Sequence, residues 1–309
     1  MNAKKTKKIV VLATGGTIAG LTDDLCSPQN YKAGQVEVNA LMTDVNTGGI
    51  DWVSEQLAQI DSKDMSFALW QQLLERTQHW LLQDDVQGVV ITHGTDTLEE
   101  TAYFLQAVLS PNKPVAITCA MLPANAPDSD GPANLEEAMS WVQRSDAFGV
   151  ALVCAGHVHP GDAVQKLHSQ QRNPFVTVSP AAHQLPWGLP SVEEVLAVQT
   201  WPRVEIVLNH AGADGRLVRA MCAHDAPDGW VVAGTGNGTL HHDLEAALRD
   251  AQAQGMRVLR TSRCALGGVQ SRAGDVLAHA GALTAVQARV ALLLELIKER
   301  AAPKEKAAQ

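Results

Sequence analysis

Short runs of apolar residues, each ending in a polar turn, mark the first half of the chain. Residues 9–13 read Ile-Val-Val-Leu-Ala and residues 89–91 read Val-Val-Ile. Continuous apolar runs of this length are typical of parallel strands covered on both faces. A helical pattern follows the second run as far as Leu105, and Thr97 and Glu100 have the spacing of a capping box. The pattern therefore predicts strands whose carboxyl ends lead into helix amino ends.

The same alternation continues along the rest of the chain. Residues 66–82 carry apolar side chains at helical spacing. Further strands are expected at 115–119, 149–154, 204–208, 230–233 and 257–261, and further helices from Asn134 and near 242–254 and 284–300. Strands that alternate with helices indicate an α/β fold. We expect two α/β domains, a larger N-terminal one with a mostly parallel, doubly wound sheet and a smaller C-terminal one.

Proline spacing suggests the domain boundaries. Four prolines fall between residues 179 and 202, which is typical of a connection rather than of a helix or strand. We assign residues 1–185 to an N-terminal catalytic domain, 186–202 to a linker and 203–302 to the C-terminal domain. Residues 303–309 are expected to form a disordered tail.

Composition narrows the possible partners. The chain has 309 residues, of which 46% are hydrophobic and 18% charged, enough for two domains with cores of their own. A net charge of −9 argues against nucleic acid or an anionic membrane as a partner. No apolar run approaches the ~20 residues that cross a bilayer. We therefore expect a small-molecule ligand.

The amino end and the cysteines favour a cytoplasmic protein. The lysine-rich start followed by residues 9–13 is similar to a signal peptide, but the apolar run breaks at Thr14, and cleavage there would remove the first strand. The number of cysteines is odd, and they form no C-x-x-C pair. We interpret them as small buried apolar residues.

Threonines stand at the ends of the two predicted strands. Thr95 and Asp96 lie where a strand meets a helix, and Thr14–Gly20 repeats the design. In open α/β sheets ligands bind at such ends, and the free N–H groups of a helix start favour an anion or a developing oxyanion. A tight turn without chemistry is an equally good interpretation of Gly-Gly after a strand. A phosphate loop is disfavoured, because the P-loop lysine and a G-x-G-x-x-G pattern are both missing.

The two segments together resemble a known enzyme family. TGGTIAG at residues 14–20 and THGTDTLEETA at residues 92–102 are similar to the two signatures of the bacterial L-asparaginase and glutaminase-asparaginase family. The similarity extends through residues 130–134, 234–238 and the final helix. It implies a threonine amidohydrolase that converts L-asparagine to L-aspartate and ammonia without a cofactor. A dual glutaminase-asparaginase is the first alternative.

The resemblance assigns catalytic roles to five residues. Thr17 would be the nucleophile, and Tyr31, on the loop at residues 20–35, would activate it. Thr95, with Lys166 and Asp96, would position the water that cleaves the acyl-enzyme. These roles together amount to a double displacement, a common route for hydroxyl nucleophiles.

The resemblance also assigns substrate-binding residues. Ser62 and Asp96 would hold the α-carboxylate and α-ammonium of the substrate, and Lys63 stands where the family usually has Gln. Asn237 would support the pocket of a neighbouring subunit, which implies a homo-oligomer, either a dimer or a tetramer. The later family loop that supplies a Glu has none here, and Asp275 is the nearest acid.

Lys63 and the missing Glu open two questions. Lys63 would bring positive charge close to the substrate's α-ammonium, or would swing onto its α-carboxylate. Both departures leave room for an amino-acid-binding protein on the same fold, because fold alone does not establish catalysis. A metal site at His157, His159 and His168 is disfavoured, since no Cys, Asp or Glu falls at a recognised ligand spacing.

Overall fold

The computed structural model describes residues 7–43, 45–178 and 188–302, which form two compact units. The N-terminal unit ends at Thr177 and the C-terminal unit starts at Val178. The predicted tail at 303–309 and the first two residues of the predicted linker at 186–202 lie outside the described residues. The rest of that linker contains a short helix, α5 (Val192–Leu196), which begins in a capping box formed by Ser191 and Glu194.

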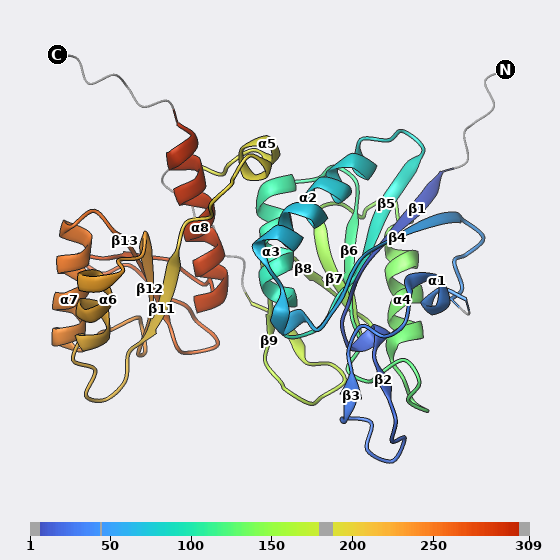
Figure 1. Cartoon of the computed structure of the whole chain (residues 1–309), viewed down its shortest axis with the longest axis horizontal. Coiled ribbons are helices and arrows are strands. Elements are labelled where there is room, and N and C mark those ends of the chain that lie inside the picture. Colours follow the sequence, from blue (N-terminus) through green and yellow to red (C-terminus); the bar gives the residue numbers. More distant parts are fainter. Residues whose placement is uncertain (1–6, 44, 179–187, 303–309) are drawn as a thin grey trace. The chain divides into compact units, whose positions relative to one another are not determined.

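A six-stranded sheet forms the centre of the N-terminal unit (Figure 1). Its strands, in spatial order, are β4 (Asp51–Ile60), β1 (Lys8–Gly15), β5 (Val86–Thr92), β6 (Val115–Thr118), β7 (Val150–Cys154) and β8 (His157–Pro160). All neighbouring pairs are parallel except β7 and β8. The predicted mostly parallel sheet is confirmed. Because Ala13 pairs with Thr92, the carboxyl ends of β1 and β5 lie side by side.

Helices cover both faces of this sheet (Figure 1). One face carries α2 (Phe67–Leu81) and α3 (Leu98–Leu109), which stack Trp70 on Phe104 with ring centroids 4.8 Å apart. The other face carries α1 (Val38–Leu41) and α4 (Gly131–Trp141), whose apolar residues join those of β1 and β5 in one core. Two antiparallel hairpins complete the unit: β2 (Leu21–Thr22) with β3 (Tyr31–Lys32), and β9 (Val164–Lys166) with β10 (Phe175–Thr177).

The C-terminal unit is a second, smaller α/β domain, as predicted. Its parallel strands, in order, are β11 (Val204–Leu208), β12 (Gly229–Gly234), β13 (Arg257–Ser262) and β14 (Ala278–His279). Side chains of α6 (Arg216–His224) and α7 (His242–Ala253) share a core with Trp230 and Val232. The last helix, α8 (Ala285–Ala301), packs against β11, β12 and β13, and Lys298 binds Glu194 of α5 at 2.9 Å.

Several local predictions were wrong. Thr97 is the N-cap of α3, but its side chain accepts no hydrogen bond from the first turn, so the predicted capping box does not form. Its hydroxyl donates instead to the Ser62 carbonyl at 2.8 Å. Helix α4 begins at Gly131 rather than Asn134, because proline fits the first turn of a helix. Two of the five cysteines, Cys26 and Cys264, are exposed rather than buried.

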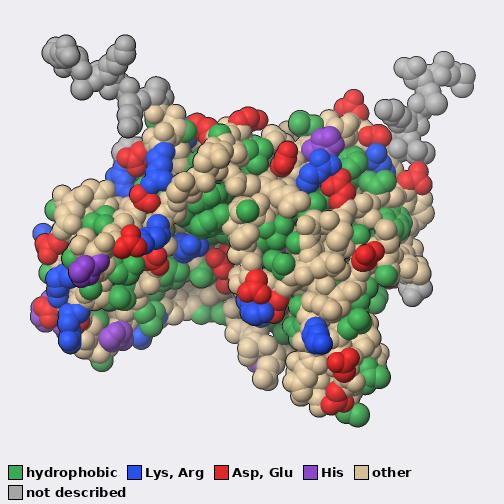
Figure 2. All heavy atoms as spheres, viewed as in Figure 1, with side chains coloured by type: hydrophobic (Ala, Val, Ile, Leu, Met, Phe, Trp, Pro, Cys, Tyr) green, Lys and Arg blue, Asp and Glu red, His purple; other side chains and the backbone are tan. Residues whose placement is uncertain are grey.

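The surface shown in Figure 2 carries mixed charge. Acidic and basic side chains are interspersed over both units on that face, with apolar side chains between them. Among the described helices, none combines the length and the apolar character that a membrane crossing requires.

Candidate active site

Two glycines bring three strand ends together. Gly16 has φ 82°, and a Cβ on it would lie 2.4 Å from the Gly94 nitrogen. A Cβ on Gly94 would lie 2.5 Å from the Ser62 hydroxyl oxygen. Neither position tolerates a side chain, since such contacts are far inside van der Waals distance. Thr17 and Thr95, the residues that follow these glycines, are therefore held close to each other and to Ser62.

Thr17 is paired with the phenol of Tyr31. Its hydroxyl oxygen lies 2.6 Å from the Tyr31 oxygen, and the residue is only 6% exposed. The β2–β3 hairpin that carries Tyr31 is fixed to the Thr17 turn by backbone bonds, from Gly34 N–H to Gly16 at 3.1 Å and from Gln35 N–H to Ala19 at 2.6 Å. The structure thus brings the predicted nucleophile and its predicted activator together.

Thr95 is paired with an ammonium instead. The Lys166 ammonium donates to the Thr95 hydroxyl at 2.7 Å and to an Asp96 carboxylate oxygen at 2.7 Å. The Lys166 side chain is 15% exposed and that of Asp96 is 57% exposed, so this group opens outward at Asp96. All three predicted members of the second catalytic group lie in contact.

Ser62 connects the third strand end to this group. It follows β4, is 2% exposed, and its hydroxyl accepts a hydrogen bond from the Asp96 N–H at 3.1 Å. The side chain of the next residue, Lys63, is bound to neighbouring aspartates and not to this group. Its ammonium lies 2.7 Å from Asp61 and 3.4 Å from Asp64, and its side chain is 62% exposed. The hydrogen bond to Asp61 raises the pKa of Lys63.

A buried polar chain that sequence reasoning missed supports the Thr95 turn. The Trp70 indole N–H donates to the Thr101 hydroxyl at 3.0 Å, and that hydroxyl lies 3.0 Å from His93 Nε2. His93 Nδ1 lies 2.7 Å from the Gly94 carbonyl oxygen. Burial lowers the pKa of His93 to about 4, so the imidazole is neutral at pH 7 and donates through Nδ1. This series of hydrogen bonds fixes the orientation of the Gly94 carbonyl, which belongs to the peptide group that leads into Thr95.

The remaining predicted residues belong to the C-terminal unit. The Asn237 side chain donates to the Gln270 carbonyl at 2.8 Å and accepts from the Gln270 N–H at 2.7 Å. It therefore ties two loops of its own unit. Asp275 lies 2.8 Å from the Arg260 guanidinium and accepts from the Arg272 N–H at 2.9 Å. Its carboxylate is already neutralised within this unit.

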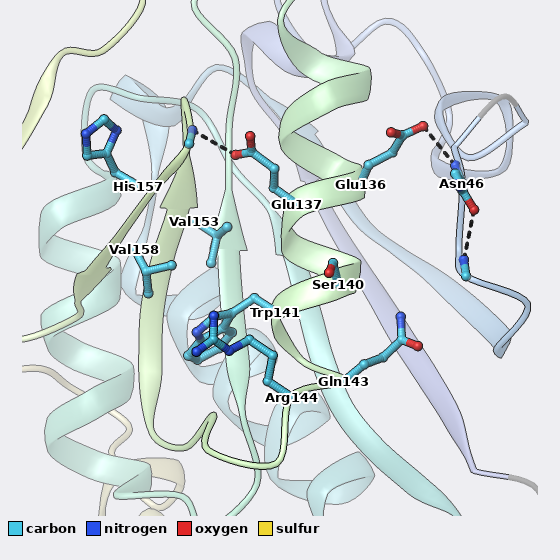
Figure 3. Close-up of a pocket in the computed structure, with 12 residues that line it drawn as sticks. Asn46, Glu136, Glu137, Ser140, Trp141, Gln143, Arg144, Val153, His157 and Val158 are labelled. Atoms are coloured by element: carbon cyan, nitrogen blue, oxygen red, sulfur yellow. Dashed lines mark hydrogen bonds between the residues drawn. The ribbon is translucent and has the colours of Figure 1, made fainter.

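A groove of about 570 Å³ lies away from the threonines, between α4 and β8 (Figure 3). Its two carboxylates have structural tasks, because Glu136 accepts from the Asn46 N–H at 3.0 Å and Glu137 from the Gly156 N–H at 2.9 Å. Neither Thr17 nor Thr95 is among the residues that line this groove. We therefore place the candidate site at the strand ends.

Two of the three histidines considered for a metal site, His157 and His159, make other contacts. The rings of His157 and His159 stack 5.9 Å apart, and His159 Nδ1 lies 2.8 Å from the Thr177 hydroxyl. Within the described ranges, the group that could hold a metal ion is formed by His241, His242 and Asp243 at the start of α7. That group belongs to the C-terminal unit, whereas the threonines belong to the N-terminal one.

Two family models match this chain, one for each unit. Residues 8–186 match the family model described as Asparaginase, N-terminal, and residues 203–308 match the Glutaminase/Asparaginase C-terminal domain. The chain is 32% identical to L-asparaginase 2 of Bacillus subtilis (strain 168), over 96% of this chain and 84% of that protein. It is 30% identical to the glutaminase-asparaginase of Pseudomonas fluorescens biotype A, over 95% and 87% of the two chains.

A solved structure extends the likeness to the fold. The crystal structure of a probable cytoplasmic L-asparaginase from Campylobacter jejuni superimposes with a TM-score of 0.83 at 30% identity, over 95% of this chain and 98% of that one. The two family models together span nearly the whole sequence, and the two named relatives are similar over 84% and 87% of their own lengths. The chain belongs to the bacterial L-asparaginase family of amidohydrolases.

Proposed function

We propose that this amidohydrolase is an L-asparaginase, which hydrolyses L-asparagine to L-aspartate and ammonia by a double displacement on a threonine. The observation that carries the proposal is the pair of threonine hydroxyls at adjoining strand ends, one bound to a phenol and the other to an ammonium–carboxylate pair. A nucleophile within hydrogen-bond reach of a proton-handling partner is the signature of covalent catalysis.

In the first displacement the Thr17 oxygen attacks the side-chain amide carbon of the substrate. Its proton passes to the Tyr31 oxygen, 2.6 Å away, while the phenol's own hydrogen passes to the amide nitrogen of the substrate. The amide C–N bond then breaks, the nitrogen leaves as ammonia, and an acyl ester remains on Thr17. Backbone N–H groups at the adjoining turns are suited to stabilise the negative oxygen that develops on the substrate.

In the second displacement water cleaves the ester. The Thr95 hydroxyl accepts from Lys166, so its own hydrogen stays available and its oxygen is held at a fixed position. Lys166 gives one hydrogen to the Asp96 carboxylate and, as the neutral amine, takes through the Thr95 hydroxyl the proton that the attacking water loses. A proton then passes to the Thr17 oxygen as the ester C–O bond breaks. The carboxylic acid product then leaves, and Thr17 regains its hydrogen.

Ser62 and Asp96 are the proposed ligands of the α-carboxylate and α-ammonium. They lie next to each other, with the Ser62 hydroxyl hydrogen available because its oxygen accepts from the Asp96 N–H. Asp275, bound to Arg260 and to the Arg272 N–H, is a poor substitute for the family glutamate. The proposed α-ammonium site therefore has Asp96 as its negative charge, without a second carboxylate from Asp275.

A dual glutaminase-asparaginase is the second candidate, because a relative of that name is similar at 30% identity over 95% of this chain. Ammonia release from asparagine, glutamine and succinamate, measured with coupled enzymes, separates the candidates. We expect hydrolysis of asparagine to exceed that of glutamine at least tenfold in kcat/KM, about 1.4 kcal/mol. Equal rates would favour dual specificity, and no ammonia from any amide would favour a binding protein.

We also propose a cytoplasmic homo-oligomer, a dimer or a tetramer. The intact Asn237 loop supports an oligomer, because the family places this loop beside a neighbour's pocket. The apolar side chains of α8 do not add to this argument, since they are buried against β11, β12 and β13 of their own unit. Sedimentation should show a dimer or tetramer, and dilution below its dissociation constant should lower the specific activity. A fully active monomer would contradict the proposal.

A further inference from the structure

The hairpin that carries Tyr31 has little stability of its own. Its strands, β2 and β3, are two residues long each and, among the described strands, pair only with each other (Figure 1). An isolated two-stranded hairpin is marginally stable in water. The first displacement nevertheless requires the Tyr31 oxygen to stay at its 2.6 Å distance from the Thr17 oxygen. Contacts from outside the hairpin must therefore hold Tyr31 in place.

Thr22 is the residue through which such a contact reaches Tyr31. It belongs to β2, lies directly opposite Tyr31 in the strand pairing and is only 5% exposed. Its hydroxyl donates to the carbonyl of Asn30, the residue before Tyr31, at 2.7 Å. A displacement of Thr22 would therefore displace Tyr31 as well.

Asn125, on the loop after β6, binds Thr22 from outside the hairpin. Its side-chain oxygen accepts from the Thr22 N–H at 3.0 Å, and its side-chain nitrogen donates to the Thr22 carbonyl at 2.8 Å. A carboxamide offers both an acceptor and a donor, so one side chain satisfies both backbone groups of Thr22. The residue before it adds a third bond, from the Ala124 N–H to the Gly20 carbonyl at 2.8 Å.

The loop that carries Asn125 is itself fixed to the sheet and to α4. It follows β6 directly, and the Asp130 carboxylate, at the N-cap of α4, accepts from the Met121 N–H and the Leu122 N–H, both at 2.9 Å. Asn125 thus connects the hairpin to a well-anchored part of the N-terminal unit.

We propose that Asn125 is a positioning residue for the first displacement, which keeps Tyr31 within reach of Thr17 by binding both backbone groups of Thr22. The inference rests on the proposed role of Tyr31 as the activator of Thr17. Without the Asn125 side chain, the hairpin stays attached through the backbone bonds that follow Tyr31, but β2 loses its two side-chain bonds to the loop. The phenol then spends less time at the nucleophile, and acylation slows.

The test is a double-mutant cycle of Asn125→Ala with Tyr31→Phe, measured as kcat/KM for asparagine, which reports the steps up to ammonia release. We expect Asn125→Ala to lower kcat/KM roughly five- to tenfold, because small misplacements of a catalytic group are costly. In the Tyr31→Phe background, which has no hydroxyl to place, the same change should cost less than about twofold.

Asn46→Ala is the matched control. Asn46 is also an exposed asparagine whose side chain binds a backbone N–H, that of Gly48 at 3.0 Å, but it lines the groove between α4 and β8. This variant should keep the wild-type kcat/KM. If Asn125→Ala does not fold, Asn125→Asp replaces it in the cycle, because a carboxylate keeps the shape and the acceptor but loses the donor to the Thr22 carbonyl.

An equal loss from Asn125→Ala in both backgrounds would overturn the inference, since damage unrelated to the phenol adds to the effect of removing it. The two proposals fail separately. A slow Tyr31→Phe enzyme beside a normal Asn125→Ala enzyme refutes the role of Asn125 alone. Full activity of Tyr31→Phe refutes the proposed activation of Thr17, and the inference with it.

Discussion

The ends of β1 and β5 share one backbone design but lead to different chemistry. In both, a glycine that nothing larger can replace stands just beyond the buried strand, Gly16 after β1 and Gly94 after β5, and a threonine follows it at once. Thr17 meets a phenol from a hairpin that begins four residues later, whereas Thr95 meets an ammonium from a strand about seventy residues further on. Both threonines are less than 8% exposed.

The comparison shows that the position of each hydroxyl and its chemical activation depend on different parts of the structure. The glycines and the parallel register place both hydroxyls, and the partner decides what each can do. A neutral phenol can pass a proton between nucleophile and leaving group without introducing charge. An ammonium flanked by Asp96 favours a developing negative charge on water. The comparison therefore predicts that each threonine acts in its own half of the reaction.

The largest expected effect comes from removing either hydroxyl. Thr17→Ala and Thr95→Ala should each lower kcat by roughly three orders of magnitude or more, because losing one member of a nucleophilic unit commonly costs that much. Steady-state ammonia release measures the loss. In Thr95→Ala the acyl group should remain on Thr17, where mass spectrometry of peptides locates it.

Thr14→Ala is the matched control. The Thr14 hydroxyl donates to the Thr92 carbonyl at 2.9 Å, inside the sheet and away from the substrate, so its loss should leave kcat within a few-fold. If Thr17→Ala kept more than about a tenth of the wild-type kcat, a loss of only ~1.4 kcal/mol, Thr17 would not be the nucleophile.

The sequence predicts the strands and the threonines because their signals are local. The apolar runs at residues 9–13 and 89–91 have the length and flanking glycines of covered parallel strands, and the structure contains them as β1 and β5. Strand β4 was not predicted, because it mixes polar and apolar residues and lies at the edge of the sheet, where its side chains are half-buried. Edge strands lack the continuous apolar run that identifies central ones.

What could not be predicted depends on contacts between distant segments. Thr97 fits the capping-box pattern, yet the Ser62 carbonyl, 35 residues earlier, takes its hydroxyl hydrogen. The orientation of Lys63 depends on Asp61 and Asp64, which compete with any substrate for its ammonium. The placement of Lys166 beside Thr95 depends on β9 packing against α3, and no spacing within the sequence reveals that contact.

The second prediction separates the two halves of the reaction by their partners. Tyr31→Phe should slow acylation roughly ten- to a hundredfold, whereas Lys166→Met should slow deacylation by about two to three orders of magnitude, the usual range for general acid–base groups. Rapid-quench measurement of ammonia distinguishes them. Lys166→Met should release one ammonia per active site in a burst, and Tyr31→Phe should show no burst. A burst from Tyr31→Phe would mean that the phenol acts after acylation instead.

The smallest expected effect concerns the third strand end, which borders both threonines and carries Lys63. A positive charge there opposes the substrate's α-ammonium, and the C-terminal loop offers no free acid to offset it, since Asp275 is bound to Arg260. We expect a KM for asparagine in the millimolar range and weak discrimination against amides without the α-amine. Lys63→Gln should lower KM about three- to tenfold, less than an isolated charge would give, because Asp61 and Asp64 already neutralise most of it. Asp275→Asn should leave KM unchanged. Either a micromolar KM in the wild type or a higher KM in Lys63→Gln would show that the ammonium leaves its two aspartates to bind the α-carboxylate, which would make Lys63 a substrate ligand.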